Sequence, residues 1–153
     1  MKTTGKIFVV DPSPLNWLFV LFHTMEELVR ADHEGNVTPS LARNVRWINE
    51  TTLEVELRRG VLFHNGEVFN AKSLVRSFAE EQRWLAPHPP GTWLNLPRER
   101  GVEVVDDYTV RFHFLEPEGL ALAKTRGVHI GNDLFWETLG FGYAKEASGE
   151  GRW

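Results

Sequence analysis

The sequence predicts an α/β fold with an α+β tendency, in which a small, mostly antiparallel sheet of hairpins carries packed helices. Two stretches have the same hairpin pattern, with strands at 45–48 and 53–57 around a turn at 49–52, and strands at 102–105 and 109–114 around a turn at 106–108. Such short connections require antiparallel pairing. A helix predicted over residues 71–83 directs Leu74, Val75 and Phe78 inward, so we expect it to pack on this sheet.

A continuous run, residues 53–78, joins a strand, a tight turn and a capped helix. Apolar and charged residues alternate over residues 53–58, which predicts a strand with one buried and one solvated face. Gly60 ends this strand, and Asn65-Gly66 is a strong turn signal because both residues tolerate positive φ. Asn70 is placed to accept hydrogen bonds from the free amides of the helix. These polar groups indicate structural roles and no catalytic centre.

The two ends of the chain predict further elements. Residues 7–10 are typical of a buried strand, and the turn at 11–14 follows it. Apolar residues then recur at helical spacing up to Arg30, which predicts a helix. After the second hairpin we expect a short helix over residues 120–124 and an apolar patch over residues 134–139.

Residues 57–74 resemble the signature of the extracellular solute-binding proteins of family 5, which serve peptide, nickel and related ABC importers. Asn65 stands where that family usually has aspartate, and Lys72-Ser73 replaces its usual Glu-Asp pair. Three further blocks, at 28–30, 35–42 and 102–112, follow the family's order. The resemblance implies part of a periplasmic-binding-protein-like lobe: a single N-terminal lobe fragment over residues 1–153, with a compact sheet-plus-helix unit over residues 31–118.

The resemblance also implies a function, which is to bind a peptide or another small solute, without catalysis, for the ABC permease of an importer. A cytoplasmic ligand-sensing module of a transcriptional regulator is the alternative. Asn16 and Trp17 follow the first predicted strand, near the place where the family's chain borders the binding cleft, and they are the candidate ligand-binding residues.

The same resemblance assigns structural roles to several residues. Trp47 takes the position of a core tryptophan, and His64 is expected to hold the turn through a hydrogen bond from its side chain to the backbone. The structural motif comprises Gly60, Phe63, His64, Asn65, Gly66 and Asn70.

Composition narrows the classes of function. A length of 153 residues with 42% hydrophobic side chains is expected to form one domain. The net charge of -4 is spread along the chain, so we expect no nucleic-acid partner. The chain has no cysteine, and its six histidines (23, 33, 64, 88, 113 and 129) do not have metal-ligand spacing. We therefore predict no metal, no cofactor and no enzymatic activity.

The sequence leaves localisation open. The apolar stretch at 14–22 is interrupted by Asn16 and lacks the features of a secretory signal, and no run is long enough to span a bilayer. Either Met1 replaces a removed leader and the protein is periplasmic or extracellular, or the chain is a cytoplasmic relative. If the chain stops where the rest of the lobe would begin, we expect either that it binds peptides no tighter than about millimolar or that it associates with itself through an exposed edge.

Overall fold

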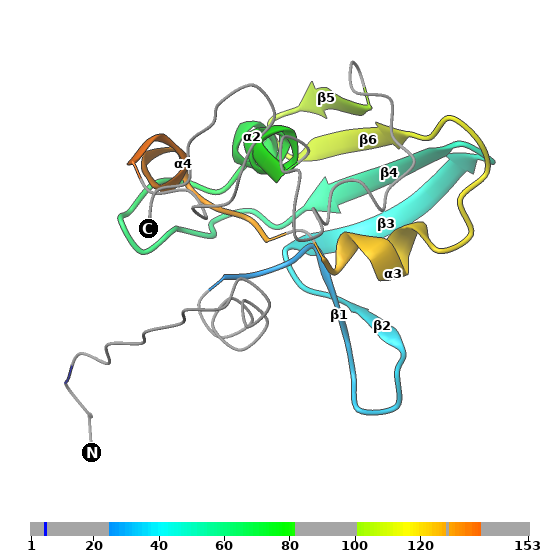
Figure 1. The fold of residues 1–153 in the computed structure, drawn as a ribbon, viewed down its shortest axis with the longest axis horizontal. Helices are drawn as coiled ribbons and strands as arrows, with labels where there is room; N and C mark the ends of the chain where they lie inside the picture. The colour runs from blue at the N-terminus through cyan, green and yellow to red at the C-terminus, as the bar shows by residue number, and fades with distance from the viewer. Residues whose placement is uncertain (1–4, 6–24, 82–100, 128, 139–153) are drawn as a thin grey trace.

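The computed structural model describes residues 5, 25–81, 101–127 and 129–138. Within these ranges lie a two-stranded sheet, a four-stranded sheet and three helices (Figure 1). The elements in chain order are β1 Val29–Ala31, β2 Val37–Pro39, β3 Ala42–Asn49, β4 Thr52–Leu57, α2 Ala71–Glu81, β5 Val102–Asp106, β6 Thr109–His113, α3 Ala121–Thr125 and α4 Asp133–Thr138.

The larger sheet has the strand order β3-β4-β6-β5, and every pairing in it is antiparallel. Its hairpins β3–β4 and β5–β6 are the two that the sequence predicts. The strands β4 and β6, far apart in the sequence, pair in the middle of the sheet with Leu53 opposite Phe112 and Val55 opposite Val110. The predicted fold class is therefore confirmed.

One face of this sheet forms the core with α2. Leu74 is fully buried, and the ring centroid of Phe78 lies 4.9 Å from that of Phe112 on β6. Val75, which was expected to point inward, is only half-buried. The core also takes in residues beyond the predicted 31–118 unit, namely Leu28, Val29, Ala121 and Ile130.

The connection between β4 and α2 contains the predicted tight turn, but its register differs from the expectation. The amide of Gly66 donates to the carbonyl of Phe63 (2.9 Å), so His64 and Asn65 occupy the two central positions of the turn. Gly66 follows them with φ 89°, in the left-handed region that favours glycine. The His64 side chain is exposed and makes no hydrogen bond with a described residue. Backbone bonds and the Asn65 Oδ1, which accepts from the amide of Glu67 at 3.1 Å, hold the turn in place of His64.

The predicted cap of α2 is confirmed. The Asn70 Oδ1 accepts from the amides of Lys72 (2.9 Å) and Ser73 (3.3 Å), and the Ser73 Oγ accepts from the amide of Asn70 (3.0 Å). This reciprocal arrangement satisfies amides that a helix start leaves free. The amide of Ala71 donates to the carbonyl of Asp107 (2.8 Å), which joins the start of α2 to the β5–β6 turn.

The prediction of a helix up to Arg30 is wrong for its last residues, because Val29–Ala31 forms the strand β1. Its partner β2 follows a turn in which the Asp32 Oδ1 accepts from the amides of Glu34 and Asn36, and Gly35 has φ 88°. This turn chemistry overrides the helical spacing of the apolar residues. The earlier part of that helix and the predicted strand at 7–10 lie outside the described residues.

The expectation that Trp47 belongs to the core is also wrong. Trp47 is 43% exposed, because β3 is an edge strand of the sheet. One side of its ring contacts Phe114, with ring centroids 5.7 Å apart. The tryptophan therefore covers the end of the core rather than filling it.

The last described helix, α4, is fastened to α2 through one serine, and it lies beside α2 in Figure 1. The Ser77 Oγ accepts from the amide of Gly131 and from the Trp136 Nε1, both at 3.1 Å. Trp136 is 5% exposed, so these bonds are shielded from water. The apolar patch predicted at 134–139 thus includes a buried anchor.

Candidate functional site

The polar face of the four-stranded sheet, opposite the face that packs on α2, gathers most of the described charged side chains that bond across strands. Side chains alternate between the two faces of a strand. The buried Leu53, Val55 and Leu57 of β4 therefore leave Thr52, Glu54 and Glu56 on the other face. Cross-strand pairing adds Asn44, Arg46, Thr109, Arg111 and His113 to the same face.

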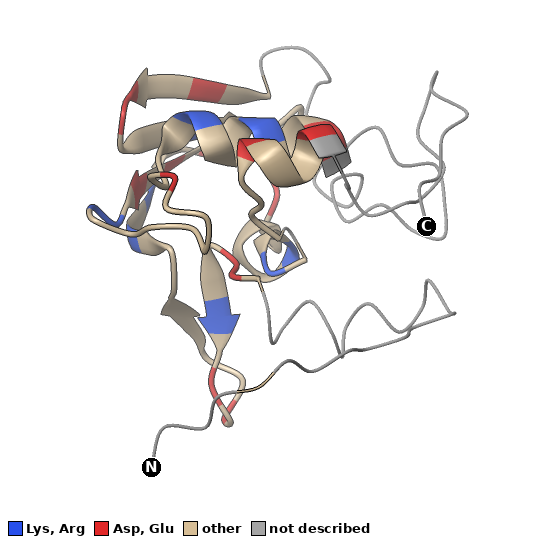
Figure 2. Cartoon of the chain, turned by 90° about the vertical axis from the view of Figure 1, so that its left-hand side faces the viewer, with Lys and Arg blue, Asp and Glu red and all other residues tan. Residues whose placement is uncertain are grey.

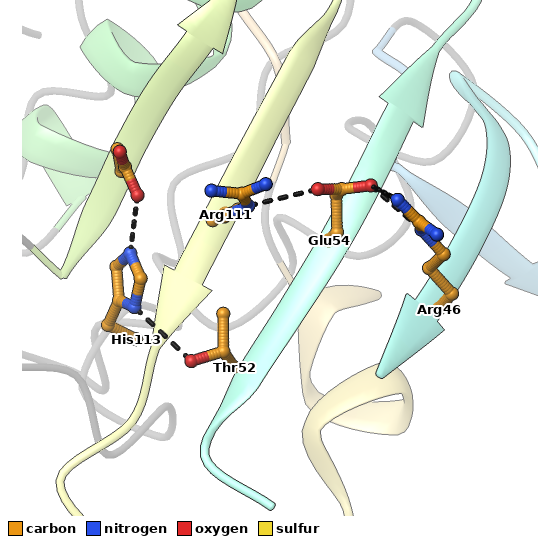
Figure 3. A network of polar contacts seen from close by, with 6 residues as sticks. Arg46, Thr52, Glu54, Arg111 and His113 are labelled. Carbon is orange, nitrogen blue, oxygen red and sulfur yellow. Dashed lines mark hydrogen bonds and ion pairs between the residues drawn. The ribbon is translucent and has the colours of Figure 1, made fainter. Parts of the chain in front are cut away.

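Glu54 is the centre of this face (Figure 3). Its Oε1 accepts from the Arg46 Nε at 2.8 Å and its Oε2 accepts from the Arg111 Nε at 2.9 Å. The two arginines come from the strands on either side of β4, and they leave Glu54 only 8% exposed. The expected solvated face of β4 is therefore covered at this position. The hydrogen bonds from Arg46, and next those from Arg111, hold the pKa of Glu54 below its ordinary value.

A second group of polar contacts lies next to the triad that Glu54, Arg46 and Arg111 form. The His113 Nε2 contacts the Glu103 Oε2 at 2.8 Å, and its Nδ1 lies 3.4 Å from the Thr52 Oγ1. The side chain of His113 is 38% exposed. These contacts link β4, β6 and β5. Together with the bonds from Arg46 of β3 to Glu54, they extend over all four strands of the sheet (Figure 3).

A hollow of about 220 Å³ opens on this face beside the triad. It is lined by Asn44, Arg46, Glu54, Glu56 and Thr109, from three neighbouring strands. The Glu56 carboxylate also contacts the Arg43 Nη1 at 3.4 Å. Charged groups of both signs thus surround the hollow, and Figure 2 shows both signs spread over the strands and α2 rather than separated.

The carboxylate at the centre of this face is not suited to acid–base chemistry. Both carboxylate oxygens of Glu54 accept hydrogen bonds from arginines, so Glu54 is held as an anion and is a poor general base.

In the described ranges no three side chains of His, Asp or Glu are grouped as a metal site. The described helices include none that is long and apolar enough to cross a bilayer.

The site residues predicted from the sequence are not the residues that line the hollow. Asn16 and Trp17 lie outside the described residues. The structural motif, Gly60 to Asn70, forms the connection between β4 and α2. The sequence reasoning missed Arg46, Glu54 and Arg111 as a group. Counting back from the predicted turn at 49–52 would have placed Arg46 opposite Val55. The irregularity between Trp47 and Asn49 shifts the register and brings Arg46 opposite Glu54, so the hairpin pattern alone gave no signal for this group.

Comparison with known proteins identifies the family. The profile of the "Bacterial extracellular solute-binding proteins, family 5 Middle" matches residues 36–146. Among solved structures, OppA of Haemophilus influenzae in complex with the peptide RPPGFSPFR has 25% identity and a TM-score of 0.68 over 82% of this chain. AppA of Bacillus subtilis in complex with a nonapeptide has 21% identity and a TM-score of 0.65 over 76% of this chain. NikA of Staphylococcus aureus in complex with Ni(L-His)2 has 15% identity and a TM-score of 0.61 over 72% of this chain.

The matched region is a small part of those structures. It covers 28% of OppA, 23% of AppA and 23% of NikA, so this chain corresponds to about a quarter of their length. None of the curated proteins compared with the chain matches it. The family profile, however, extends over well more than half of the 153 residues. The chain therefore belongs to the bacterial extracellular solute-binding proteins of family 5.

Proposed function

We propose that this protein belongs to the solute-binding component of an ABC import system and that its solute is a peptide. The observation that carries the proposal is the family match over residues 36–146. The peptide-bound OppA of Haemophilus influenzae is more similar to the chain, in both identity and TM-score, than the nickel-bound NikA of Staphylococcus aureus, which supports a peptide over a nickel complex.

The remaining parts of the proposal follow from the family. The protein has no catalytic role, and the bonding of Glu54 by two arginines supports this view because it removes the most buried carboxylate of the polar face from acid–base chemistry. Its partner is the permease of the importer, and its place is outside the cytoplasm. The regulator alternative has no support from the comparisons.

Asn16 and Trp17 remain the proposed ligand contacts. The 153-residue chain is expected to bind peptides no tighter than about millimolar, because affinity in a cleft depends on burying most of the ligand and the chain corresponds to about a quarter of its structural neighbours.

Calorimetric titration of the 153-residue chain with a peptide pool, and separately with a nickel–histidine complex, tests the proposal. The peptides should bind weakly and saturably, and Trp17→Ala should weaken that binding. Trp47→Ala is the matched control, since Trp47 is a partly exposed tryptophan that the proposal does not place in contact with the ligand. Binding of the nickel complex in preference to peptides would contradict the proposed solute.

A further inference from the structure

The hollow on the polar face of the sheet has hydrogen-bond donors on the edge strand β3 and acceptors on the next two strands, β4 and β6. Asn44 and Arg46 both come from β3, two residues apart and therefore on one face. Glu56 on β4 and Thr109 on β6 are direct cross-strand partners. A ligand that lies across these strands thus meets amide and guanidinium N–H groups over β3 and oxygen atoms over β4 and β6.

The hydrogen-bond donors on β3 have N–H groups that make no bond to a described residue. Arg46 directs its Nε and Nη2 to the Glu54 Oε1, while its Nη1 has no partner among the described residues, and the side chain is 64% exposed. The Asn44 Oδ1 accepts from the amide of Val45 at 2.9 Å. Because this bond uses the oxygen of the Asn44 side chain, the Nδ2 remains to donate into the hollow.

The acceptors on β4 and β6 are also available. The Thr109 hydroxyl bonds to the carboxylate of Asp106, which only accepts, so the hydroxyl donates there and keeps its lone pairs. The Glu56 side chain is 45% exposed and contacts the Arg43 Nη1 at 3.4 Å. One carboxylate accepts several hydrogen bonds, so Glu56 has room for another donor.

Glu54, which lies on β4 in the lining of the hollow, does not repel an anion strongly. Two arginines, Arg46 and Arg111, share this one carboxylate, so the triad carries a formal surplus of one positive charge. A ligand carboxylate placed at the Arg46 end offsets that surplus. Glu56 lies on β4 between its cross-strand partners Asn44 and Thr109, and its carboxylate favours a cation beside Thr109.

We propose that this hollow binds a small zwitterion, a free α-amino acid. Its carboxylate accepts from Arg46 and Asn44, and its ammonium donates to Glu56 and Thr109. Neighbouring strands lie about 5 Å apart, so β3 and β6, on either side of β4, are about 10 Å apart. A small amino acid with a hydrogen bond at each end spans this distance from the β3 donors to Thr109 and passes over Glu56 on β4. This inference does not depend on the proposed peptide function, and its tests are independent of that function.

The first test uses the unaltered chain and three probes. Amide NMR shifts of the 153-residue protein are followed during titration with glycine, with N-acetylglycine, which lacks the ammonium, and with glycinamide, which lacks the carboxylate. Glycine is expected to give saturable shifts at the β3, β4 and β6 positions of the hollow, with a Kd on the order of millimolar. Each blocked probe is expected to bind at least about tenfold more weakly. Equal binding of either blocked probe, or no saturable response to glycine, overturns the proposal.

The second test assigns the site to the hollow. Glu56→Gln and Asn44→Ala should each weaken glycine binding at least about tenfold, because each removes one partner of a charged ligand group. Glu103→Gln is the matched control, since it neutralises a carboxylate of β5, a strand that does not line the hollow. Variants are compared after thermal unfolding shows that each is folded. Unchanged glycine binding in both hollow variants overturns the assignment.

Discussion

The Arg111 Nε donates to the Glu54 Oε2 over 2.9 Å and thereby joins two strands whose residues are 57 positions apart. The same carboxylate accepts from Arg46 of the other neighbouring strand. One side chain on β4 thus ties together both pairings that the central strand makes. This arrangement explains how a carboxylate is accommodated at 8% exposure on a face that the sequence predicts to be solvated.

Replacing this carboxylate should destabilise the sheet. Glu54→Gln leaves two arginines without their anion, and we expect the free energy of unfolding to fall by about 1 to 3 kcal/mol near neutral pH. Since the pKa of Glu54 is lowered in the folded state, its stabilisation is present above the ordinary value of 4.5 and is lost as the pH falls through the lowered value. Urea unfolding at several pH values measures both effects. Glu50→Gln, in an exposed turn, is the control, and an equal effect of the two variants would refute the role of Glu54.

The turn before α2 should not tolerate a β-branched residue at Gly66. Its φ of 89° is unfavourable for any residue with a Cβ, so Gly66→Val is expected to destabilise the fold by about 1 kcal/mol or more. Gly119→Val is the control, because Gly119 has no positive φ and open space where a Cβ would stand. Thermal melts of the two variants decide the point: matching midpoints would mean that the backbone at Gly66 is not strained by a side chain.

Gly131 is required for a steric reason. A Cβ there would stand 2.8 Å from the Phe135 Cδ1 and 2.9 Å from the Trp136 Nε1, closer than van der Waals contact allows. Gly131→Ala must displace these rings and disturb the bonds to Ser77, so we expect a loss of about 1 to 3 kcal/mol. Chemical denaturation measures this loss, and Gly119→Ala serves as its control. A loss no larger than that of the control would show that α4 is not held closely against Gly131.

His129 should make the fold sensitive to acid. Its side chain is 1% exposed, and burial lowers the pKa of His129 to about 4 from an ordinary 6.5. Between these values the unfolded chain binds the proton and the folded chain does not. The contribution of neutral His129 is therefore complete above about pH 6.5 and is lost toward pH 4, a total of about 3 kcal/mol.

The measurement is the free energy of unfolding across this pH range for the native protein and for His129→Gln. The variant cannot gain a proton at this position, so its stability should fall less between pH 6.5 and 4. Other groups titrate equally in both proteins and cancel in the comparison. Parallel curves would contradict the assignment of this pH dependence to His129.

Self-association of the chain stays a prediction and has a specific candidate surface. The edge strand β5 exposes Val104 and Val105 to 44% and 42%. Exposed edges of this kind recruit other strands, so we expect the average mass in sedimentation to rise with concentration. Val105→Lys should reduce this rise, whereas Val37→Lys, equally exposed on β2, should not. A monomer at all concentrations would disprove the prediction.

Local patterns in the sequence were sufficient for much of the fold. The two hairpins and the Asn70 cap were predicted because alternation and capping act over a few residues. The strand at Val29–Ala31 was mistaken for helix, although the glycine turn at Gly35 was visible and could have corrected it.

The features that were missed depend on contacts between distant segments. Glu54 is covered because Arg111 arrives from a strand 57 residues later, and no short window contains both residues. Trp47 is exposed because β3 lies at the edge, which only the order of all four strands determines. The sheet order likewise decides that Asn44, Glu56 and Thr109 line one hollow.

Peptide uptake by the bacterium that carries the gene tests the central claim most directly. Cells in which the gene is deleted are compared with the parent strain and with deleted cells that carry the gene again, using labelled peptides and, in parallel, labelled nickel. Our account predicts that peptide uptake falls on deletion, returns when the gene is restored, and that nickel uptake is unaffected. Unchanged peptide uptake, or a loss of nickel uptake alone, would contradict it.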